Sequence, residues 1–232
     1  MPARCAQLLE EGAVEAALIP VIEYQRIPDV SLVPDVCVGS KGNVRSVVLV
    51  TRMQDLRHVR SIALDESSRT SAALMKIIFL EFLGVEPKWV TSAPNVDRML
   101  KDNDAALIIG DPAMTFARDG LRIVDMAGLW REHTGLSFVF AVWAVRNKDI
   151  SSVAAIDFAA ARDEGLEEIE KILSRYEREI PLARDELREY LTDDITFHID
   201  QPMTQGMQLY FDLAYKHRLI EQVKPLGFFG VP

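Results

Sequence analysis

Short apolar runs, each followed by a polar turn and a helical pattern, constrain the fold of this chain most strongly. The run "SIALD" at residues 61–65 leads into the turn "ESSRTS" and then into an apolar helix that Gly84 ends. The run "DAALIIG" at residues 104–110 leads through Asp111 into a second helix, with Pro112 at its start. Strands that alternate with helices in this way predict an α/β protein with a largely parallel sheet.

After Arg146 the sequence changes from alternating strand and helix patterns to helical patterns alone. Residues 150–191 are acidic and helical without a strong strand pattern, and residues 204–220 form another amphipathic helix. We expect a discontinuous outer lobe made of residues 1–47 and 143–232, with residues 48–142 inserted as an inner α/β lobe. Two such lobes enclose a ligand cleft.

The formal net charge of −9 narrows the class of partner. Nucleic-acid binding normally uses a basic surface, and this sequence has no cluster of lysines and arginines to form one. We therefore expect no nucleic-acid partner. An anionic small molecule fits only if local hydrogen-bond donors overcome the overall repulsion.

The cysteines and the N-terminal pattern indicate a reducing, cytoplasmic setting. Cys5 and Cys37 are far apart and have no Cys or His at metal-ligand spacing, so we expect neither a disulfide framework nor a zinc site. Residues 1–20 lack the basic and apolar segments of a leader peptide, and the longest apolar runs are strand-sized. We therefore expect no membrane segment.

The turn at residues 67–71 reads "SSRTS" and is the strongest candidate site. Backbone N–H groups at a helix start, together with hydroxyls, hold a carboxylate or phosphate, and Arg69 adds a bidentate contact. The alternative is that Ser67 or Ser68 only caps the helix while Arg69 points to solvent. A cap needs one hydroxyl, so the density of donors favours an anion site.

Two weaker candidates follow other strands. The turn "GSKGNVRS", residues 39–46, offers donors from Ser40 and Lys41 and close backbone approach at Gly42, but it lacks the spacing of a P-loop and taken alone is typical of a simple turn. Asp111 fits a general base at a strand end and, equally, an ordinary helix cap. The histidines form no triad or metal pattern and are expected to be structural or at the surface: His58, His133, His198 and His217.

Six segments carry a resemblance to a known family: "ALIPVIEYQRI", "GSKGNVRSVVLVTR", "LDESSRTSAALMKI", "DAALIIGDPAM", "GLWREHTGLSFVFAVWA" and "YLTDDITF". In order and spacing the chain resembles the chorismate dehydratases of menaquinone biosynthesis over nearly its whole length. The resemblance implies a two-lobed fold like the type 2 periplasmic binding proteins. It also implies loss of water from chorismate to give 3-(1-carboxyvinyloxy)benzoate in the futalosine route, without metal or organic cofactor.

The same resemblance assigns substrate-binding residues. Chorismate is a dianion, which suits a turn dense in donors. The matching segments are the family's S-x-G turn, its SRTS turn and its IGD strand end, here Ser40, Gly42, Ser68, Arg69, Thr70, Ser71, Gly110 and Asp111. Asn43 stands where the family often has proline, which leaves the donors of the turn in place. No catalytic base is assigned.

The sequence departs from this family at its start. Family members begin with a strand, a polar loop of the Tyr-Leu-Asn type, a helix and another strand before the helix that "ARCAQLLEEG" matches. We expect the first lobe to be incomplete, with an exposed sheet edge. Either the natural protein starts earlier or this form is truncated and of doubtful activity.

Two other functions stay open at this point. The fold supports many functions, so a non-catalytic carboxylate-binding protein or sensor is one alternative. The sister enzyme of the same pathway, which acts on a futalosine-derived nucleoside, is the other. The SRTS and TGL-FVFA-W segments fit the chorismate enzyme better.

Overall fold

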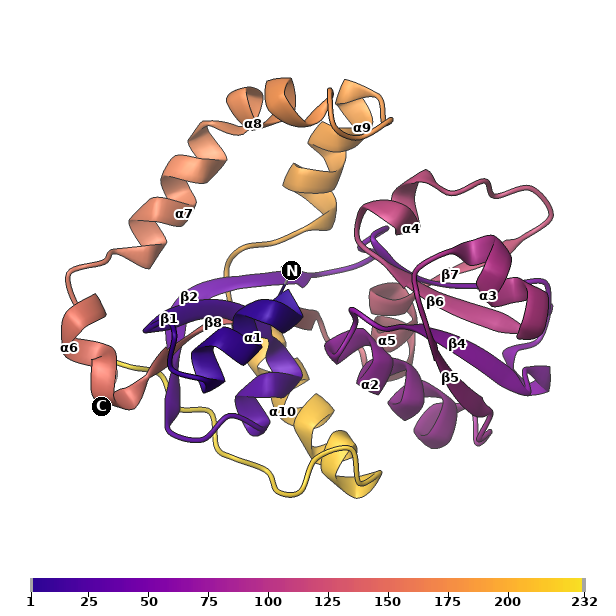
Figure 1. The fold of residues 1–232 in the computed structure, drawn as a ribbon, viewed down its shortest axis with the longest axis horizontal. Helices are drawn as coiled ribbons and strands as arrows, with labels where there is room; N and C mark the ends of the chain where they lie inside the picture. The colour runs from indigo at the N-terminus through magenta and orange to yellow at the C-terminus, as the bar shows by residue number, and fades with distance from the viewer. Residues whose placement is uncertain (1, 231–232) are drawn as a thin grey trace.

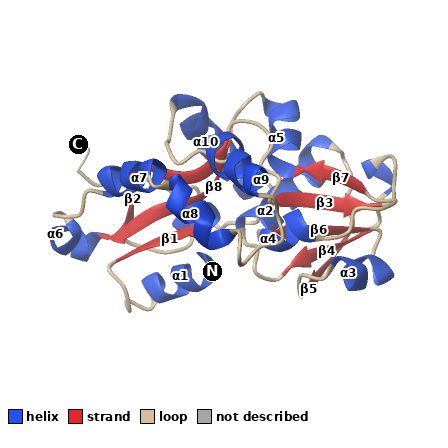
Figure 2. Ribbon diagram, turned by 90° about the horizontal axis from the view of Figure 1, so that it is seen from above, coloured by secondary structure: helices blue, strands red, loops and turns tan. Residues whose placement is uncertain are grey.

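The computed structural model describes residues 2–230, which form two β-sheets (Figures 1 and 2). The smaller sheet has the order β1-β8-β2, with β1 (Ala16–Pro20), β8 (Phe138–Arg146) and β2 (Val30–Ser40). The larger sheet has the order β5-β4-β6-β3-β7, with β5 (Lys88–Ser92), β4 (Ser61–Asp65), β6 (Ala105–Ile109), β3 (Val47–Thr51) and β7 (Arg122–Asp125). The expected lobes, with boundaries at residues 47/48 and 142/143, stay a prediction.

Strand direction differs between the two sheets. In the smaller sheet both pairs are antiparallel. In the larger sheet β4 runs parallel to β5 and β6, while β3 is antiparallel to both β6 and β7. The predicted largely parallel sheet is therefore correct for four strands and wrong for β3. The reason is that only residues 52–60 join β3 to β4, and this connection is shorter than the crossover that a parallel arrangement of the two strands needs.

Helices cover both faces of the larger sheet. The helices of this region are α2 (Thr70–Ile77), α3 (Val96–Asp102), α4 (Asp111–Thr115) and α5 (Met126–Thr134). Val48 and Val50 of β3 pack in one cluster with Met99 of α3 and Ala113 of α4. Leu49, which points to the other face, belongs to the large core that includes α2 and α5.

That large core extends across both sheets. It contains residues of α1 (Pro2–Glu10), of both sheets and of α10 (Gln201–Lys216). Its centre is aromatic: the Phe138 ring centroid lies 5.4 Å from that of Trp130 and 5.1 Å from that of Tyr210, both edge to face. Because these rings come from α5, β8 and α10, they pack the two sheets against a shared interior.

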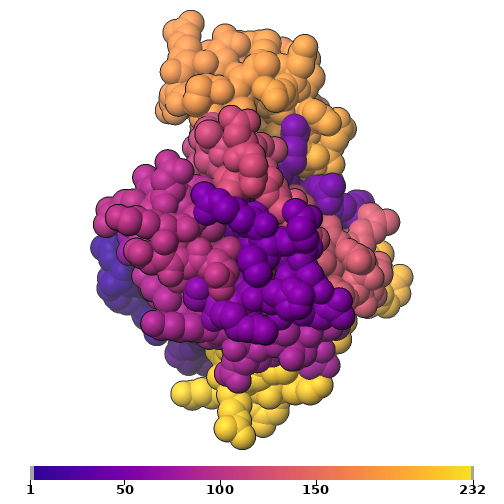
Figure 3. Space-filling view, turned by 90° about the vertical axis from the view of Figure 1, so that its right-hand side faces the viewer, coloured from indigo at the N-terminus to yellow at the C-terminus, as the bar shows by residue number. Residues whose placement is uncertain are grey.

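A helical arm projects from the smaller sheet (Figures 1 and 3). It comprises α6 (Ile150–Val153), α7 (Phe158–Glu167), α8 (Ile169–Tyr176) and α9 (Arg184–Glu189), and it returns through a π-helical turn, η5 (Tyr190–Asp194). Leu173, Ile180 and Leu187 form its own small core. Within residues 2–230, no helix has the length and apolar character that crossing a bilayer requires.

Two glycines give a matched test of packing. A Cβ on Gly206 of α10 would collide with the backbone carbonyl of Ser137, whereas one on Gly165 of α7 would meet nothing within 4 Å. We expect Gly206→Ala to lower the free energy of unfolding by about 1–3 kcal/mol through overpacking. Gly165→Ala should raise it by up to about 1 kcal/mol, because alanine favours the helix. Urea unfolding measures the free energy of unfolding of both variants. Equal changes in the two variants would contradict the prediction.

Candidate functional site

A cavity of about 270 Å³ lies at the start of α2 and takes its walls from both sheets. Its apolar walls include Leu18 of β1, Phe140 of β8 and Ile109 of β6. The polar groups come from the SSRTS turn and from two other segments: Ser46, Ser67, Ser68, Arg69, Thr70, Ser71 and Tyr190. The volume is just below the usual range of about 300–1,000 Å³ for small-molecule pockets.

Ser68 carries an uncommitted donor in this cavity. Its residue is only 7% exposed, and its hydroxyl has no hydrogen-bonding partner among residues 2–230. Burying an unpaired hydroxyl costs about 1–3 kcal/mol, so such groups are rare without a reason. A ligand oxygen in the cavity would satisfy it.

The start of α2 is not capped by a serine. Ser67 donates its hydroxyl to the Asp65 carboxylate at 2.6 Å, and no side chain among residues 2–230 accepts from the first amides of α2. The alternative that Ser67 or Ser68 serves only as a helix cap is therefore wrong. The uncapped N–H groups at the start of α2 are suited to an anion.

Arg69 lines the cavity and is held by a buried carboxylate. Its guanidinium lies 2.6 Å from one oxygen of Glu23, and Arg26 lies 2.6 Å from the other. The Glu23 side chain is 4% exposed, against 38% for Arg69 and 42% for Arg26. Arg69 is thus paired and does not simply point to solvent. The sequence reasoning missed Glu23, whose only signal was a charged residue inside the apolar run "LIPVIEY".

The remaining residues of the turn have different roles. Thr70 donates its hydroxyl to the Phe140 carbonyl at 3.1 Å, and its own carbonyl accepts from the Tyr210 hydroxyl at 3.0 Å. These bonds tie the start of α2 to β8 and α10. Ser71 is buried and lines the cavity.

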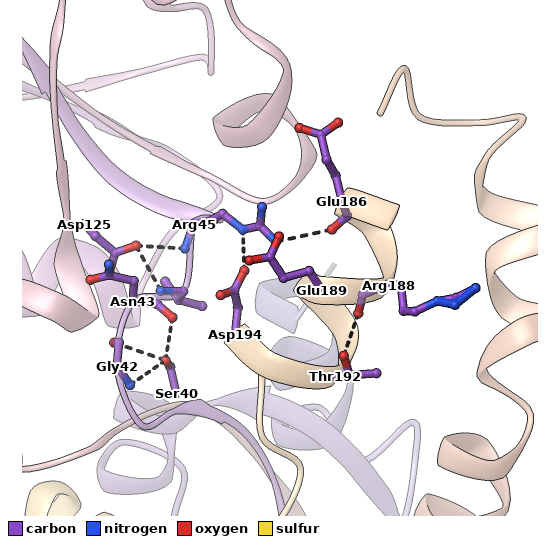
Figure 4. A network of polar contacts seen from close by, with 11 residues as sticks. Ser40, Gly42, Asn43, Arg45, Asp125, Glu186, Arg188, Glu189, Thr192 and Asp194 are labelled. Atoms are coloured by element: carbon purple, nitrogen blue, oxygen red, sulfur yellow. Dashed lines mark hydrogen bonds and ion pairs between the residues drawn. The ribbon is translucent and has the colours of Figure 1, made fainter. Parts of the chain in front are cut away.

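The other predicted residues divide into two groups. Gly110 lines the cavity, at the end of β6, with a φ of 67°. Asp111 is exposed in the first turn of α4, and neither it nor Ser40 or Gly42 lines the cavity. The Ser40 hydroxyl closes its own turn, donating to the Asn43 carbonyl at 2.9 Å and accepting from the Gly42 amide at 3.2 Å (Figure 4). Substrate binding by all of these residues stays a prediction.

The turn between β2 and β3 is anchored on the Asp125 carboxylate (Figure 4). One oxygen accepts from the amides of Val44 at 2.9 Å and Arg45 at 2.8 Å, while the other accepts from Ala127 and Gly128 at the start of α5, both at 3.0 Å. The anchor holds Arg45 in a left-handed conformation, with a φ of 57°. Non-glycine residues adopt such backbone only when their surroundings impose it.

Arg45 connects this turn to the helical arm. Its guanidinium pairs with Asp194, lies 3.4 Å from Glu189 and donates to the Glu186 carbonyl at 3.2 Å (Figure 4). These contacts hold η5 in place, and Tyr190 of η5 lines the cavity. The sequence analysis matched "YLTDDITF" to the family as a segment but assigned no role to Tyr190 within it.

A second, apolar hollow of about 350 Å³ lies between the arm and the smaller sheet. Trp143, Phe158 and Cys37 are among its lining residues. Burial, with the nearby carboxylates of Asp200 and Asp35, raises the pKa of Cys37 to about 12, so this thiol stays protonated at neutral pH. Within residues 2–230, no three His, Cys, Asp or Glu side chains gather as metal ligands.

The sequence is similar to proteins of known families. A family profile described as menaquinone biosynthesis matches residues 1–216. A chorismate dehydratase from Thermus thermophilus is 29% identical over 229 residues, which cover 90% of this chain and 83% of the relative.

Two solved structures share the fold. Protein AF1704 from Archaeoglobus fulgidus has a TM-score of 0.70 at 16% identity, covering 95% of this chain and 85% of its own. The periplasmic aliphatic sulphonate binding protein SsuA from Escherichia coli has a TM-score of 0.65 at 12% identity, covering 100% of this chain and 82% of its own. These likenesses confirm the predicted α/β fold of the periplasmic-binding-protein kind.

Two serines give a matched test of the uncommitted donor. Ser68→Ala removes a buried hydroxyl that has no partner in the described part of the chain, so we expect the free energy of unfolding to stay the same or rise by about 1 kcal/mol. Ser40→Ala removes a hydroxyl that closes a turn, so a loss of about 1–2 kcal/mol is expected. Urea unfolding measures both free energies. If Ser68→Ala lost as much stability as Ser40→Ala, the Ser68 hydroxyl would not be an unpaired donor.

Proposed function

Because the chain belongs to the menaquinone-biosynthesis family, we propose that it is a hydro-lyase that removes water from chorismate to form 3-(1-carboxyvinyloxy)benzoate. The observation that carries the proposal is the uncommitted Ser68 hydroxyl beside Arg69 at the uncapped start of α2. As part of this proposal, the reaction belongs to the futalosine route and takes place in the cytoplasm. The name of the Thermus thermophilus relative, chorismate dehydratase, supports the proposed reaction.

The chemistry of the cavity fits one carboxylate of a dianion. The overall charge of −9 repels such a ligand, so binding needs a local concentration of donors. The start of α2 supplies backbone N–H groups, the Ser68 hydroxyl and the Arg69 guanidinium on one wall. Arg69 shares its charge with Glu23, which also holds the guanidinium in a defined place.

The proposed elimination makes modest demands on the protein. Loss of the ring hydroxyl and a neighbouring ring proton creates an aromatic ring, so the reaction is strongly favoured once the substrate is oriented. A substrate bound between Leu18, Ile109 and Phe140 displaces water from the polar groups, which strengthens their interactions. The ring proton also needs an acceptor.

The size of the cavity bears on the alternative substrate. At about 270 Å³ it suits a single-ring dianion better than a larger futalosine-derived nucleoside. A non-catalytic carboxylate-binding protein would use the same donors, and the experiment below separates it from the enzyme.

A mass-resolved assay of the purified chain with chorismate tests the proposal, with calorimetric binding measured in parallel. We expect a product that is lighter than chorismate by one water. Binding without conversion would replace the dehydratase with the carboxylate-binding protein. Absence of both binding and conversion by folded protein would overturn both functions.

Arg69 and Arg26 give a matched test of the anion site. Both pair with Glu23 at 2.6 Å and have similar exposure, but only Arg69 lines the cavity. We expect Arg69→Ala to weaken chorismate binding about 10- to 100-fold, the effect of losing a charge-assisted hydrogen bond. Arg26→Ala should lose similar stability and leave binding nearly unchanged. Calorimetry measures affinity and urea unfolding measures stability. If the two variants bound chorismate equally well, Arg69 would not be part of the binding site.

A further inference from the structure

We propose that Tyr190 is a catalytic residue, whose hydroxyl donates a hydrogen bond to the ring oxygen of the substrate that leaves as water. This inference rests on the proposed dehydratase function and adds a role for a second wall of the same cavity. It is carried by the position of Tyr190, by the charges around it and by the contacts that hold it.

Tyr190 reaches the cavity from an element remote in sequence from the SSRTS turn. It is the first residue of η5, whereas Ser68 and Arg69 precede α2. All three line one cavity of about 270 Å³, so a single small ligand bound there is within reach of both segments. The π-helical form of η5 is a second indication, since such turns are frequent at functional sites.

The charges near Tyr190 differ from those near Ser68. The carboxylates of Asp111 and Asp194 are close enough to act on the phenol, and Arg45 offsets them in part. The start of α2 offers N–H groups and a guanidinium. A substrate carboxylate is therefore favoured at α2, and the neutral ring hydroxyl is favoured beside Tyr190.

The phenol is kept in its donor form. Burial raises the pKa of Tyr190, and the Asp111 and Asp194 carboxylates act in the same direction, while a hydrogen bond with Ser46 opposes them. At neutral pH the hydroxyl is therefore protonated and able to donate.

Arg45 acts as a positioning residue for this hydroxyl. Its partners bracket Tyr190 in the chain: Glu189 precedes it directly, and Asp194 ends the same turn. The Asp125 anchor in turn holds Arg45 in its left-handed conformation. The orientation of Tyr190 is thus set before substrate binds, as catalysis by preorganised donors requires.

The proposed step is balanced without any further reactant. The ring carbon–oxygen bond breaks with its electron pair going to oxygen, and the neighbouring ring carbon loses one proton. The departing oxygen gains one proton and leaves as water, so no net proton is consumed. Tyr190 donates a hydrogen bond to the oxygen as negative charge develops on it. Tyr190 itself transfers no net proton.

A simple packing role is the competing explanation. The Tyr190 ring also packs against the large hydrophobic core. Phenylalanine would serve that purpose equally well. Tyr190→Phe therefore separates the two explanations, because it keeps the ring and removes only the hydroxyl.

The experiment measures kcat and KM for chorismate with the wild type, Tyr190→Phe and the control Tyr176→Phe; Tyr176, on α8, is 42% exposed. We expect Tyr190→Phe to lower kcat about 100-fold with KM within about threefold, as for loss of one donor to developing charge. Tyr176→Phe should match the wild type. Thermal unfolding confirms that each variant folds.

Arg45→Gln provides a second variant with its own readout. It should lower kcat, and the double variant Arg45→Gln/Tyr190→Phe should be no slower than Tyr190→Phe alone, because Arg45 acts through the missing hydroxyl. Additive losses would overturn the positioning role of Arg45.

The remaining outcomes are distinct. If the wild type leaves chorismate unchanged, the proposed function fails and this inference fails with it. If the wild type converts chorismate and Tyr190→Phe keeps its kcat, only the role of Tyr190 is overturned. A raised KM at unchanged kcat also overturns it, since the hydroxyl would then bind substrate and transition state equally.

Discussion

The carboxylate of Asp125 is the interaction on which the arrangement of the site depends. Its two oxygens accept four backbone N–H groups, two from the turn that crosses between the sheets and two from the start of α5. The crossing turn also carries Arg45, which holds the returning end of the helical arm. The Asp125 side chain therefore helps to fix the relative positions of the smaller sheet, the larger sheet and η5. All three contribute walls of the cavity.

The cavity retains local costs that packing alone does not explain. Among residues 2–230, the buried Ser68 hydroxyl has no partner and α2 has no side-chain cap, while Arg45 adopts a left-handed backbone conformation. Each feature costs stability, and all three lie at or beside one cavity. Local costs of this kind at a cavity are typical of a site prepared for a ligand. In a chain with a net charge of −9, it also creates the local donors that an anion needs.

Sequence reasoning predicted the parts of the molecule that depend on near neighbours. The strand, turn and helix from Ser61 to Ile77 formed as expected, and the SSRTS turn and Gly110 meet at one cavity. It failed for β3, whose antiparallel direction follows from the short connection to β4. The Ser40 hydroxyl closes its own turn, as expected for a simple turn, and Ser40 does not line the cavity.

The sequence by itself determined the periodic apolar runs, the turns that begin helices and the supply of donors after β4, because these depend on residues a few positions apart. Only the tertiary structure decided which distant groups meet. The pairing of Glu23 with Arg69 joins residues 46 positions apart, and Tyr190 reaches the Ser68 cavity from the returning end of the helical arm. No local pattern encodes such meetings, because they follow from how two sheets and an arm pack around a shared core.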